Sequence, residues 1–420
     1  MSPSALLASV TELLRAVLKL DAPADGIVSR HFRDQRSLGS RERHLLAETT
    51  YTVLRLKARL AHLAQSGRGP LERRLALLAW VGPESMLEAA CTPEEYAWAR
   101  HARAIDPATL PDPQRHNLPD WLATPLRERL GEEDFWALVE ACNRSAPLDL
   151  RVNALKARRE EVQQQLAEAG IEAQPTPWSP WGLRVEGKPA LQRLPVFTEG
   201  LVEVQDEGSQ LLALLTEARR SEMVADFCAG AGGKTLALGA MMRSTGRLYA
   251  FDTAGHRLEA LKPRMARSGL SNVYPAQIAH ARDERIKRLT GKLDRVLVDA
   301  PCSGLGTLRR NPDLKWRQTP QALAELQEKQ RAILASAARL LKPGGRLVYA
   351  TCSLLEEENE AIAEAFSAAH PAFVPVAAAE VLARARIENI DTLVRGPHLR
   401  LWPQRHGTDG FFAAVWDRKA

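Results

Sequence analysis

The feature that most constrains this sequence is a regular alternation of strand-like and helix-like segments between residues 222 and 300. Such βαβ alternation predicts a parallel, doubly wound sheet with right-handed crossovers. Later β-rich stretches, "GGRLVYATC" and "FFAAVWD", supply further strands. The strand-like runs of the alternating region are residues 223–227, 246–252, 272–278 and 295–301.

Chemically useful residues stand where these predicted strands end. Asp226, Asp252 and Asp299 close three of the runs, and residues 350–352 close a later one. In an open α/β sheet, ligands bind beside the carboxyl ends of the strands. We therefore expect these residues to converge on one edge of the sheet and to form a site there.

A glycine turn, "DFCAGAGGKT", follows the first strand and opens a helix. Glycines at such a turn permit tight turning and close approach of a ligand to the backbone. A phosphate-binding loop would need glycine where Cys228 stands, which disfavours an ATPase. The G-x-G-x-x-G pattern of nicotinamide-binding proteins is also missing. An acid at the end of the second strand, here Asp252, accepts hydrogen bonds from ribose hydroxyls, so the pattern favours S-adenosylmethionine.

Two of the chain's five cysteines, Cys302 and Cys352, stand just past predicted strands on this edge. The cysteines are scattered and form no CxxC, which argues against a disulfide framework and against a metal site. A free cysteine is often only a small buried hydrophobe. The position of this pair beside a predicted methyl donor favours a chemical role instead.

Thiols beside a methyl donor suit one reaction in particular. Carbon 5 of a pyrimidine is too weak a nucleophile to accept a methyl group unaided. A thiolate that adds at carbon 6 makes carbon 5 enamine-like, which is covalent catalysis. An acid must contact the ring as charge develops, and a base must remove the carbon-5 proton. Asp299, three residues before Cys302, is placed for the contact with the ring. One cysteine would attack carbon 6, and the other would help to release the covalent adduct between protein and pyrimidine.

These residues carry a family resemblance. The stretches "DFCAGAGGKT", "DAPCSGLG…RRNPDLKW" and "YATCSLLEEEN" resemble the successive motifs of the RNA cytosine-C5 methyltransferases of the RsmB/Sun type. The similarity extends to "LRVN", "VQDEGSQ" and "RLWPQRHGTDGFF", and so covers roughly residues 145–420. The helical front of the chain is similar to the NusB-like RNA-binding domain of the bacterial 16S ribosomal RNA enzyme.

The resemblance implies a role for each matching residue. Cys352 would attack carbon 6, Cys302 would assist release of the methylated RNA, and Asp299 would be shared between cofactor and cytosine. Arg309, Arg310 and Lys315, which follow Cys302, would grip RNA phosphates. The family's acid after the third strand is replaced here by Ala279 and His280, with Asp283 beyond. The cofactor would be held by Cys228, Ala229, Gly230, Ala231, Gly232, Gly233, Lys234, Asp252 and Asp299.

The rest of the chain predicts a division into domains. Residues 1–140 show helical periodicity and form the NusB-like, all-α domain; residues 145–215 form a small α+β, RRM-like subdomain; and residues 216–420 form the Rossmann-like methyltransferase domain. Between Val28 and Leu77 the sequence contains eleven Arg and Lys residues but only four acidic residues. This excess of basic residues, together with the net charge of +6, favours a surface that binds RNA over a helix face that only contacts solvent.

The leading hypothesis is methylation of carbon 5 of a cytosine in RNA, with 16S ribosomal RNA or a small-subunit precursor as substrate. The alternative is a non-catalytic RNA-binding factor for ribosome assembly on the same fold. No apolar run is long enough for a membrane span and the start lacks signal-peptide features, so we expect a cytoplasmic protein. We also expect a monomer.

Overall fold

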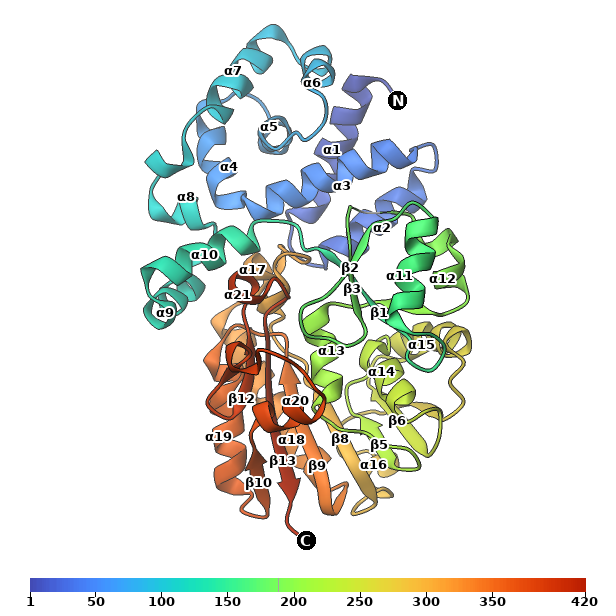
Figure 1. Ribbon diagram of the computed structural model, residues 1–420. Helices are drawn as coiled ribbons and strands as arrows, with labels where there is room; N and C mark the ends of the chain where they lie inside the picture. Colours follow the sequence, from blue (N-terminus) through green and yellow to red (C-terminus); the bar gives the residue numbers. More distant parts are fainter. Residues whose placement is uncertain (188) are drawn as a thin grey trace. The chain divides into compact units, whose positions relative to one another are not determined.

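The computed structural model describes residues 1–187 and 189–420, which form two compact units (Figure 1). The first unit comprises Met1–Ser145 together with Thr307–Pro320. The second comprises Ala146–Gly306 together with Gln321–Ala420. The predicted catalytic domain, residues 216–420, thus includes a segment, Thr307–Pro320, that groups with the helical unit in the structure.

The first unit is helical. Helix α1 forms much of its core, because Leu6, Val10, Leu13 and Val17 recur at helical spacing and are almost completely buried. The unit's helices are α1 (Pro3–Val17), α2 (Ala24–Asp34), α3 (Ser40–Arg55), α4 (Lys57–Leu63), α5 (Leu71–Leu78), α6 (Glu84–Ala90), α7 (Pro93–Arg103), α8 (Asp112–His116), α9 (Asp120–Leu130), α10 (Glu132–Cys142) and α17 (Leu314–Arg317).

Segment 307–320 is held in the helical unit by hydrogen bonds to its helices. The indole Nε1 of Trp316 donates to the Leu54 carbonyl at 2.7 Å. Arg55 donates from its guanidinium to the Arg309 carbonyl at 3.2 Å. At the start of α2, the Ala24 N–H donates to the Asp313 carboxylate at 3.2 Å. The sequence "RRNPDLKW" is therefore a structural part of this unit, although it continues the cysteine motif in the chain.

The second unit begins with a small α+β subdomain. Its antiparallel sheet has the strand order β2-β3-β1-β4 and packs on α11 (Arg159–Glu168) and α12 (Pro195–Thr198). Leu150, Leu183 and Val202 from the sheet meet Val162 and Leu166 from α11 in one core. The strands are β1 (Leu148–Val152), β2 (Ala173–Pro175), β3 (Gly182–Val185) and β4 (Val202–Val204).

The large sheet of this unit has the order β11-β12-β13-β9-β8-β5-β6-β7, and β10 pairs with β13. Strands β5 to β9 run parallel, and β13 is antiparallel to β9. The chain moves outward from β5 to β7 and then crosses back to β8, so the switch point lies between β5 and β8. The strands are β5 (Met223–Asp226), β6 (Arg247–Asp252), β7 (Val273–Gln277), β8 (Leu293–Asp299), β9 (Leu341–Thr351), β10 (Phe373–Val376), β11 (Val394–Arg395), β12 (His398–Leu401) and β13 (Phe411–Arg418).

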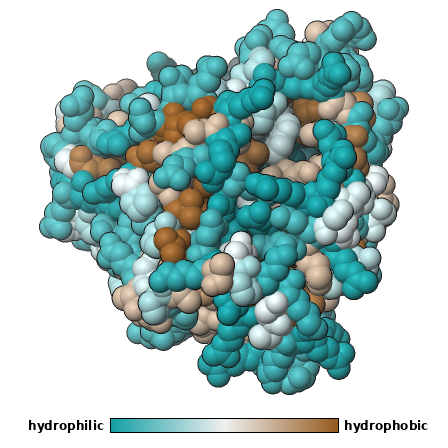
Figure 2. Space-filling model, turned by 60° about the horizontal axis from the view of Figure 1, so that its bottom comes forward, coloured by the Kyte–Doolittle hydropathy of each residue, from teal (hydrophilic) through white to brown (hydrophobic). Residues whose placement is uncertain are grey.

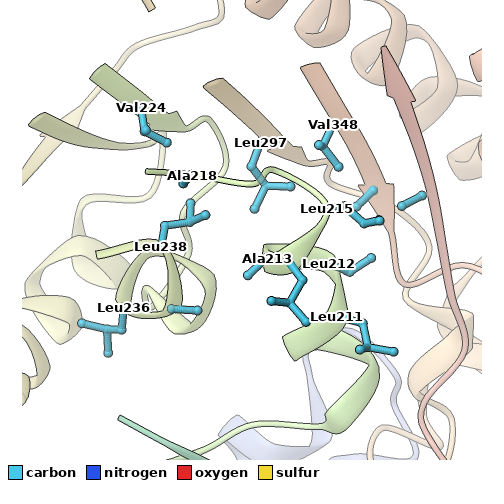
Figure 3. Packing of buried hydrophobic residues seen from close by; sticks show 14 of the residues in the cluster. Leu211, Leu212, Ala213, Leu215, Ala218, Val224, Leu236, Leu238, Leu297 and Val348 are labelled. Carbon is cyan, nitrogen blue, oxygen red and sulfur yellow. The ribbon is translucent and has the colours of Figure 1, made fainter. Parts of the chain in front are cut away.

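Helices cover both faces of this sheet, as the sequence predicts. Side chains alternate along each strand, so Leu297 and Val348 point to one core while Val298 and Tyr349 point to the other. Figure 3 shows the first core, in which leucines of α13 face Leu297 and Val348. The unit's further helices are α13 (Glu207–Leu214), α14 (Gly233–Met241), α15 (Gly255–Ser268), α16 (Glu284–Lys287), α18 (Pro320–Ala338), α19 (Glu360–Ala369), α20 (Ala378–Arg384) and α21 (Pro403–His406).

The surface seen in Figure 2 is mainly hydrophilic, with hydrophobic residues confined to smaller areas. The exposed large hydrophobic side chains include Val204, Tyr274 and Val374. In the part of the chain that the structure describes, no helix combines the length and the apolar character that crossing a bilayer requires.

Candidate active site

A cavity of about 600 Å³ lies at the carboxyl ends of the parallel strands of the second unit. The volume is in the range of small-molecule and cofactor sites. Strand β5 leads into it through the loop 227–234, β6 through Asp252, and β8 through Asp299 to Cys302. Cys352, just past the end of β9, also lines it. Asp252, Asp299 and Cys352 therefore converge in one cavity at this edge of the sheet, as expected, whereas Asp226 does not line it.

The glycine turn has the geometry of a ligand-binding loop. Gly232 adopts φ +85°, and a Cβ atom there would lie 2.1 Å from Cδ1 of Leu261, so only glycine fits. The Gly230 N–H donates to Oδ2 of Asp252 at 2.8 Å, which ties the turn to the end of β6. The second oxygen of Asp252 accepts from the Ala254 N–H at 2.7 Å. Each carboxylate oxygen keeps a further lone pair for a ribose hydroxyl.

The small sheet supports this turn from the opposite side. Arg151, on β1, is buried and donates to the Gly233 carbonyl at 2.5 Å and to the side chain of Gln205. Burial lowers the pKa of Arg151 to about 10, so it stays charged at neutral pH. Arg264, on α15, donates to the Ala231 carbonyl at 2.5 Å and is itself paired with Glu203 on β4. Two arginines thus fix two carbonyls of the cofactor turn.

Neither arginine was predicted as a site residue from the sequence, although a signal for Arg151 was present. Arg151 lies in "LRVN" and Gln205 in "VQDEGSQ", two stretches that carry the family resemblance. Nothing in the sequence shows that these stretches meet the glycine turn, because that contact depends on how the small sheet packs against the large one.

Asp226 lies below the turn rather than in the cavity lining. Its Oδ2 accepts from the hydroxyl of Thr235 at 2.7 Å, and the residue is 1% exposed. Burial raises the pKa of Asp226 to about 7. This carboxyl group holds the start of α14 in place and is not positioned to act on a ligand.

Lys234 and Asp299 form an ion pair on the cavity wall, with Nζ 2.7 Å from Oδ2. Burial disfavours the ammonium group, but attraction by Asp299 and the hydrogen bond to it outweigh burial and raise the pKa of Lys234. Lys234 therefore stays protonated, and its ammonium group donates a hydrogen bond to Asp299.

Cys302 and Cys352 bring their Sγ atoms to 3.5 Å from each other, although fifty residues separate them in the chain. The hydrogen bond to Cys352 and burial raise the pKa of the Cys302 thiol well above its usual value. Cys302 thus retains its proton and can donate it to the sulfur of Cys352. A third cysteine of the cavity, Cys228, is also kept as a thiol, because burial raises its pKa.

The residues of the cavity fit S-adenosylmethionine. The glycine turn leaves room for a ligand against the backbone, Asp252 offers oxygens for ribose hydroxyls, and the thiol pair lines the same cavity. A doubly wound sheet with this turn and this site defines the class of S-adenosylmethionine-dependent methyltransferases.

Comparison with known proteins specifies the family. The model of the 16S rRNA methyltransferase RsmB/F family matches residues 213–417, and a ferredoxin-like domain of RsmF/B-like methyltransferases matches residues 118–192. A probable ribosomal RNA small subunit methyltransferase B from Synechocystis is 38% identical over 302 residues, which cover 72% of this chain and 67% of the relative. The chain belongs to the RsmB/F methyltransferase family.

Further relatives are consistent with this. The ribosomal RNA small subunit methyltransferase B of Vibrio cholerae is 35% identical over 315 residues, which cover 74% of this chain and 68% of the relative. The chain thus spans about two thirds of the length of these relatives. A methyltransferase homolog from Pyrococcus horikoshii has a similar structure, with a TM-score of 0.58, 27% identity, and coverage of 70% of this chain and 98% of that protein.

The acid that the family usually carries after its third strand has no counterpart in the cavity of the described chain. Asp283 instead caps α16, where its carboxylate accepts from the N–H groups of Ala279 and Arg285 at 3.0 and 2.9 Å. The hydrophobic residues Ile278 and Ala281 line the cavity in this region. Neither His280 nor Asp283 lines it, so an adenine ring would meet an apolar wall at this point.

The predicted phosphate contact by Lys315 is wrong. Lys315 is 1% exposed, and its Nζ donates to the Arg55 carbonyl at 2.8 Å and to Oδ1 of Asn143 at 3.3 Å. Arg309 is also buried, at 5% exposure. Both residues were expected to bind RNA phosphates, but they lie in segment 307–320, which folds into the helical unit and contains α17. Arg310 is half-buried and remains a candidate for RNA contact.

Burial lowers the pKa of Lys315 from 10.5 to about 7, which gives a testable pH dependence. Between these two values the unfolded chain binds the proton and the folded chain does not, so the free energy of unfolding must rise with pH. We expect the difference in unfolding free energy between wild type and Lys315→Met to grow by up to about 3 kcal/mol from pH 7 to pH 9. Urea unfolding followed by tryptophan fluorescence measures this difference.

The control is Lys19→Met, because Lys19 is exposed on the same unit. This variant should show the same pH dependence as the wild type. Equal pH dependence in wild type and Lys315→Met would contradict the assignment of a neutral buried amine.

Proposed function

We propose that this protein transfers the methyl group of S-adenosylmethionine to carbon 5 of a cytosine in RNA, with 16S ribosomal RNA as substrate. The observation that carries the proposal is the pair of sulfur atoms 3.5 Å apart in the cavity that the glycine turn lines. A methyl transfer to oxygen or nitrogen needs no thiol, whereas attack by carbon 5 of a pyrimidine does. The ribosomal substrate is supported by the small-subunit methyltransferases that the chain resembles.

Cys352 is the nucleophile in this proposal. Its sulfur adds to carbon 6 of cytosine, and the electron pair of the ring double bond becomes available at carbon 5. The bound cofactor supplies an electrophilic methyl group at this point. The neighbouring Cys302 has a raised pKa, and its sulfur lies 3.5 Å from that of Cys352. The thiolate is the reactive form of a cysteine, so this attack requires Cys352 without its proton.

We assign contact with the pyrimidine ring to the Lys234–Asp299 pair. Charge develops on the ring when the sulfur adds, and a positioned acid that shares a proton with the ring lowers the barrier. Lys234 Nζ donates to Oδ2 of Asp299 at 2.7 Å, and both residues line the cavity that Cys352 also lines. Asp299 comes three residues before Cys302, so the ring contact and the second thiol are carried by one turn of the chain.

Cys302 acts in the second half of the reaction. After methyl transfer, carbon 5 must lose its proton so that the sulfur of Cys352 can leave carbon 6. Cys302 lies next to that sulfur, and the contact with Cys352 that raises its pKa is lost once the Cys352 sulfur is bonded to carbon 6. In this proposal Cys302 then releases its own proton to solvent, takes the carbon-5 proton as a thiolate and so becomes a thiol again, while Cys352 leaves carbon 6 as a thiolate. We therefore assign release of the methylated RNA to Cys302.

The experiment that tests this function identifies the product. The protein is incubated with S-adenosylmethionine and either 16S or 23S ribosomal RNA transcripts, and the digested nucleosides are analysed by mass spectrometry. The proposal predicts 5-methylcytidine from the 16S transcript and at least tenfold less from the 23S transcript. Methylation of a ring nitrogen or of a ribose oxygen would contradict the chemistry, and equal labelling of both transcripts would contradict the substrate.

A further inference from the structure

A buried carboxylate, that of Glu358, has no part in the chemistry described above. Glu358 is 0% exposed and lies six residues after Cys352, in "TCSLLEEEN". A buried carboxylate is costly unless donors surround it. The position of these donors indicates what Glu358 does.

Glu358 binds the residue that directly follows each of the two cysteines. Its Oε1 accepts from the backbone N–H of Ser303 at 2.8 Å, and its Oε2 accepts from the Ser303 hydroxyl at 2.5 Å. The hydroxyl of Ser353 donates to the same Oε2. The two hydroxyl groups lie 3.2 Å from each other. One carboxylate thus joins two loops that are fifty residues apart in the chain.

The carboxylate is itself held firmly. Gln330, on α18, donates to Oε1 at 2.9 Å and also to the Pro301 carbonyl at 3.0 Å, so it contacts both Glu358 and the loop of Cys302. The hydroxyl of Tyr349 donates to the Glu358 carbonyl at 2.6 Å. Glu358 therefore sits at a fixed point between α18 and β9, and its position dictates the separation of the two serines.

The loop of Cys352 has a second support. Arg400, on β12, donates to the carbonyls of Ser353 and Leu354 at 3.1 and 2.7 Å. The Cys352 carbonyl accepts from the Gly306 N–H at 2.8 Å. These bonds hold the backbone of the loop, whereas Glu358 uses its side chain to bind the serines of both loops.

We propose that Glu358 is a positioning residue whose carboxylate, by binding Ser303 and Ser353 together, sets the distance and orientation of the two reactive thiols. The proposal rests on the proposed function for its catalytic meaning, but the geometry it describes exists independently of any substrate. Catalytic groups must be held within about 0.5 Å of their productive position. A misplacement of about 1 Å can cost a hundredfold in rate.

The first test measures the thiol pair without RNA or cofactor. Dithionitrobenzoate reacts with one thiol to give a mixed disulfide and one thionitrobenzoate. A second thiol in reach displaces the other thionitrobenzoate and closes a disulfide, so the probe is reduced as the pair is oxidised. The wild type should close the Cys302–Cys352 disulfide rapidly, as seen by peptide mass spectrometry. Glu358→Gln should slow closure at least tenfold and accumulate the mixed disulfide.

The second test measures methylation of 16S transcript. Glu358→Gln should lower kcat about a hundredfold and leave the dissociation constant for S-adenosylmethionine within twofold of the wild type, because Glu358 does not line the cavity. The control is Glu357→Gln, which changes an exposed neighbour in the same motif and should match the wild type in both tests. Should Glu358→Gln fail to fold by circular dichroism, Ser353→Ala replaces it, since it removes one donor and leaves the carboxylate bound to Ser303.

The two tests separate the proposals. Disulfide closure at the wild-type rate in Glu358→Gln, or in Ser353→Ala if that variant replaces it, would overturn the positioning role. If Glu358→Gln closes the disulfide slowly but the wild type methylates no RNA, the positioning role is supported and the proposed function is refuted.

Discussion

Replacement of Cys352 by alanine is expected to reduce methylation of the 16S transcript at least about a thousandfold. In the proposed mechanism the sulfur of Cys352 supplies the bond to carbon 6. Cys302 lies 3.5 Å away but retains its proton, because the hydrogen bond to Cys352 and burial raise its pKa. Transfer of tritium from labelled S-adenosylmethionine to RNA measures the loss.

Two controls make this result specific. Cys91→Ala removes a half-buried thiol in the helical unit and should retain wild-type activity. Cys352→Ala should still bind S-adenosylmethionine in calorimetry, because the glycine turn and Asp252 are unchanged. Methylation by Cys352→Ala within tenfold of the wild type would contradict the role of nucleophile.

Replacement of Cys302 by alanine should have a different effect, which is accumulation of a covalent protein–RNA complex. Cys352 can still attack and the methyl group can still be transferred, but the base beside it is gone. The adduct then persists, and a band of reduced mobility should appear in a denaturing gel. We expect most of the enzyme to be trapped when RNA and S-adenosylmethionine are both in excess.

The double variant Cys302→Ala/Cys352→Ala is the matched control, because it should form no complex. Free turnover by Cys302→Ala at the wild-type rate would show that another group removes the carbon-5 proton. Equal amounts of complex in the single and double variants would show that the adduct involves a different residue.

Much of the catalytic domain could be predicted from the sequence, because its signals are local. The continuous apolar runs in "RVLVDA" and "RLVYAT" identify β8 and β9 as buried strands, and the end of a parallel strand fixes the edge to which Asp299 and Cys352 belong. The glycine turn could also be predicted from its glycines, and in the structure Gly232 has φ +85°, a conformation that L side chains rarely adopt.

What could not be predicted depends on packing between distant segments. The basic stretch after Cys302 carries the composition of a solvated loop, yet Trp316 and Lys315 find carbonyls of α3 as partners and become buried. Arg151 and Glu358 likewise lie in stretches that resemble family motifs. Their hydrogen-bond partners, Gly233 and Ser303, are 82 and 55 residues away in the chain. Only the folded chain shows that they support the cofactor turn and the thiol pair.

The most direct test of the central claim uses 16S transcript that contains 5-fluorocytosine. Fluorine at carbon 5 leaves no proton to remove after methyl transfer, so the adduct cannot resolve and can be mapped by mass spectrometry of the digested complex. Our account predicts a methylated 5-fluorocytosine joined through carbon 6 to the peptide that contains Cys352. Attachment to the peptide of Cys302, or the absence of any adduct in a preparation that methylates ordinary 16S transcript, would contradict it.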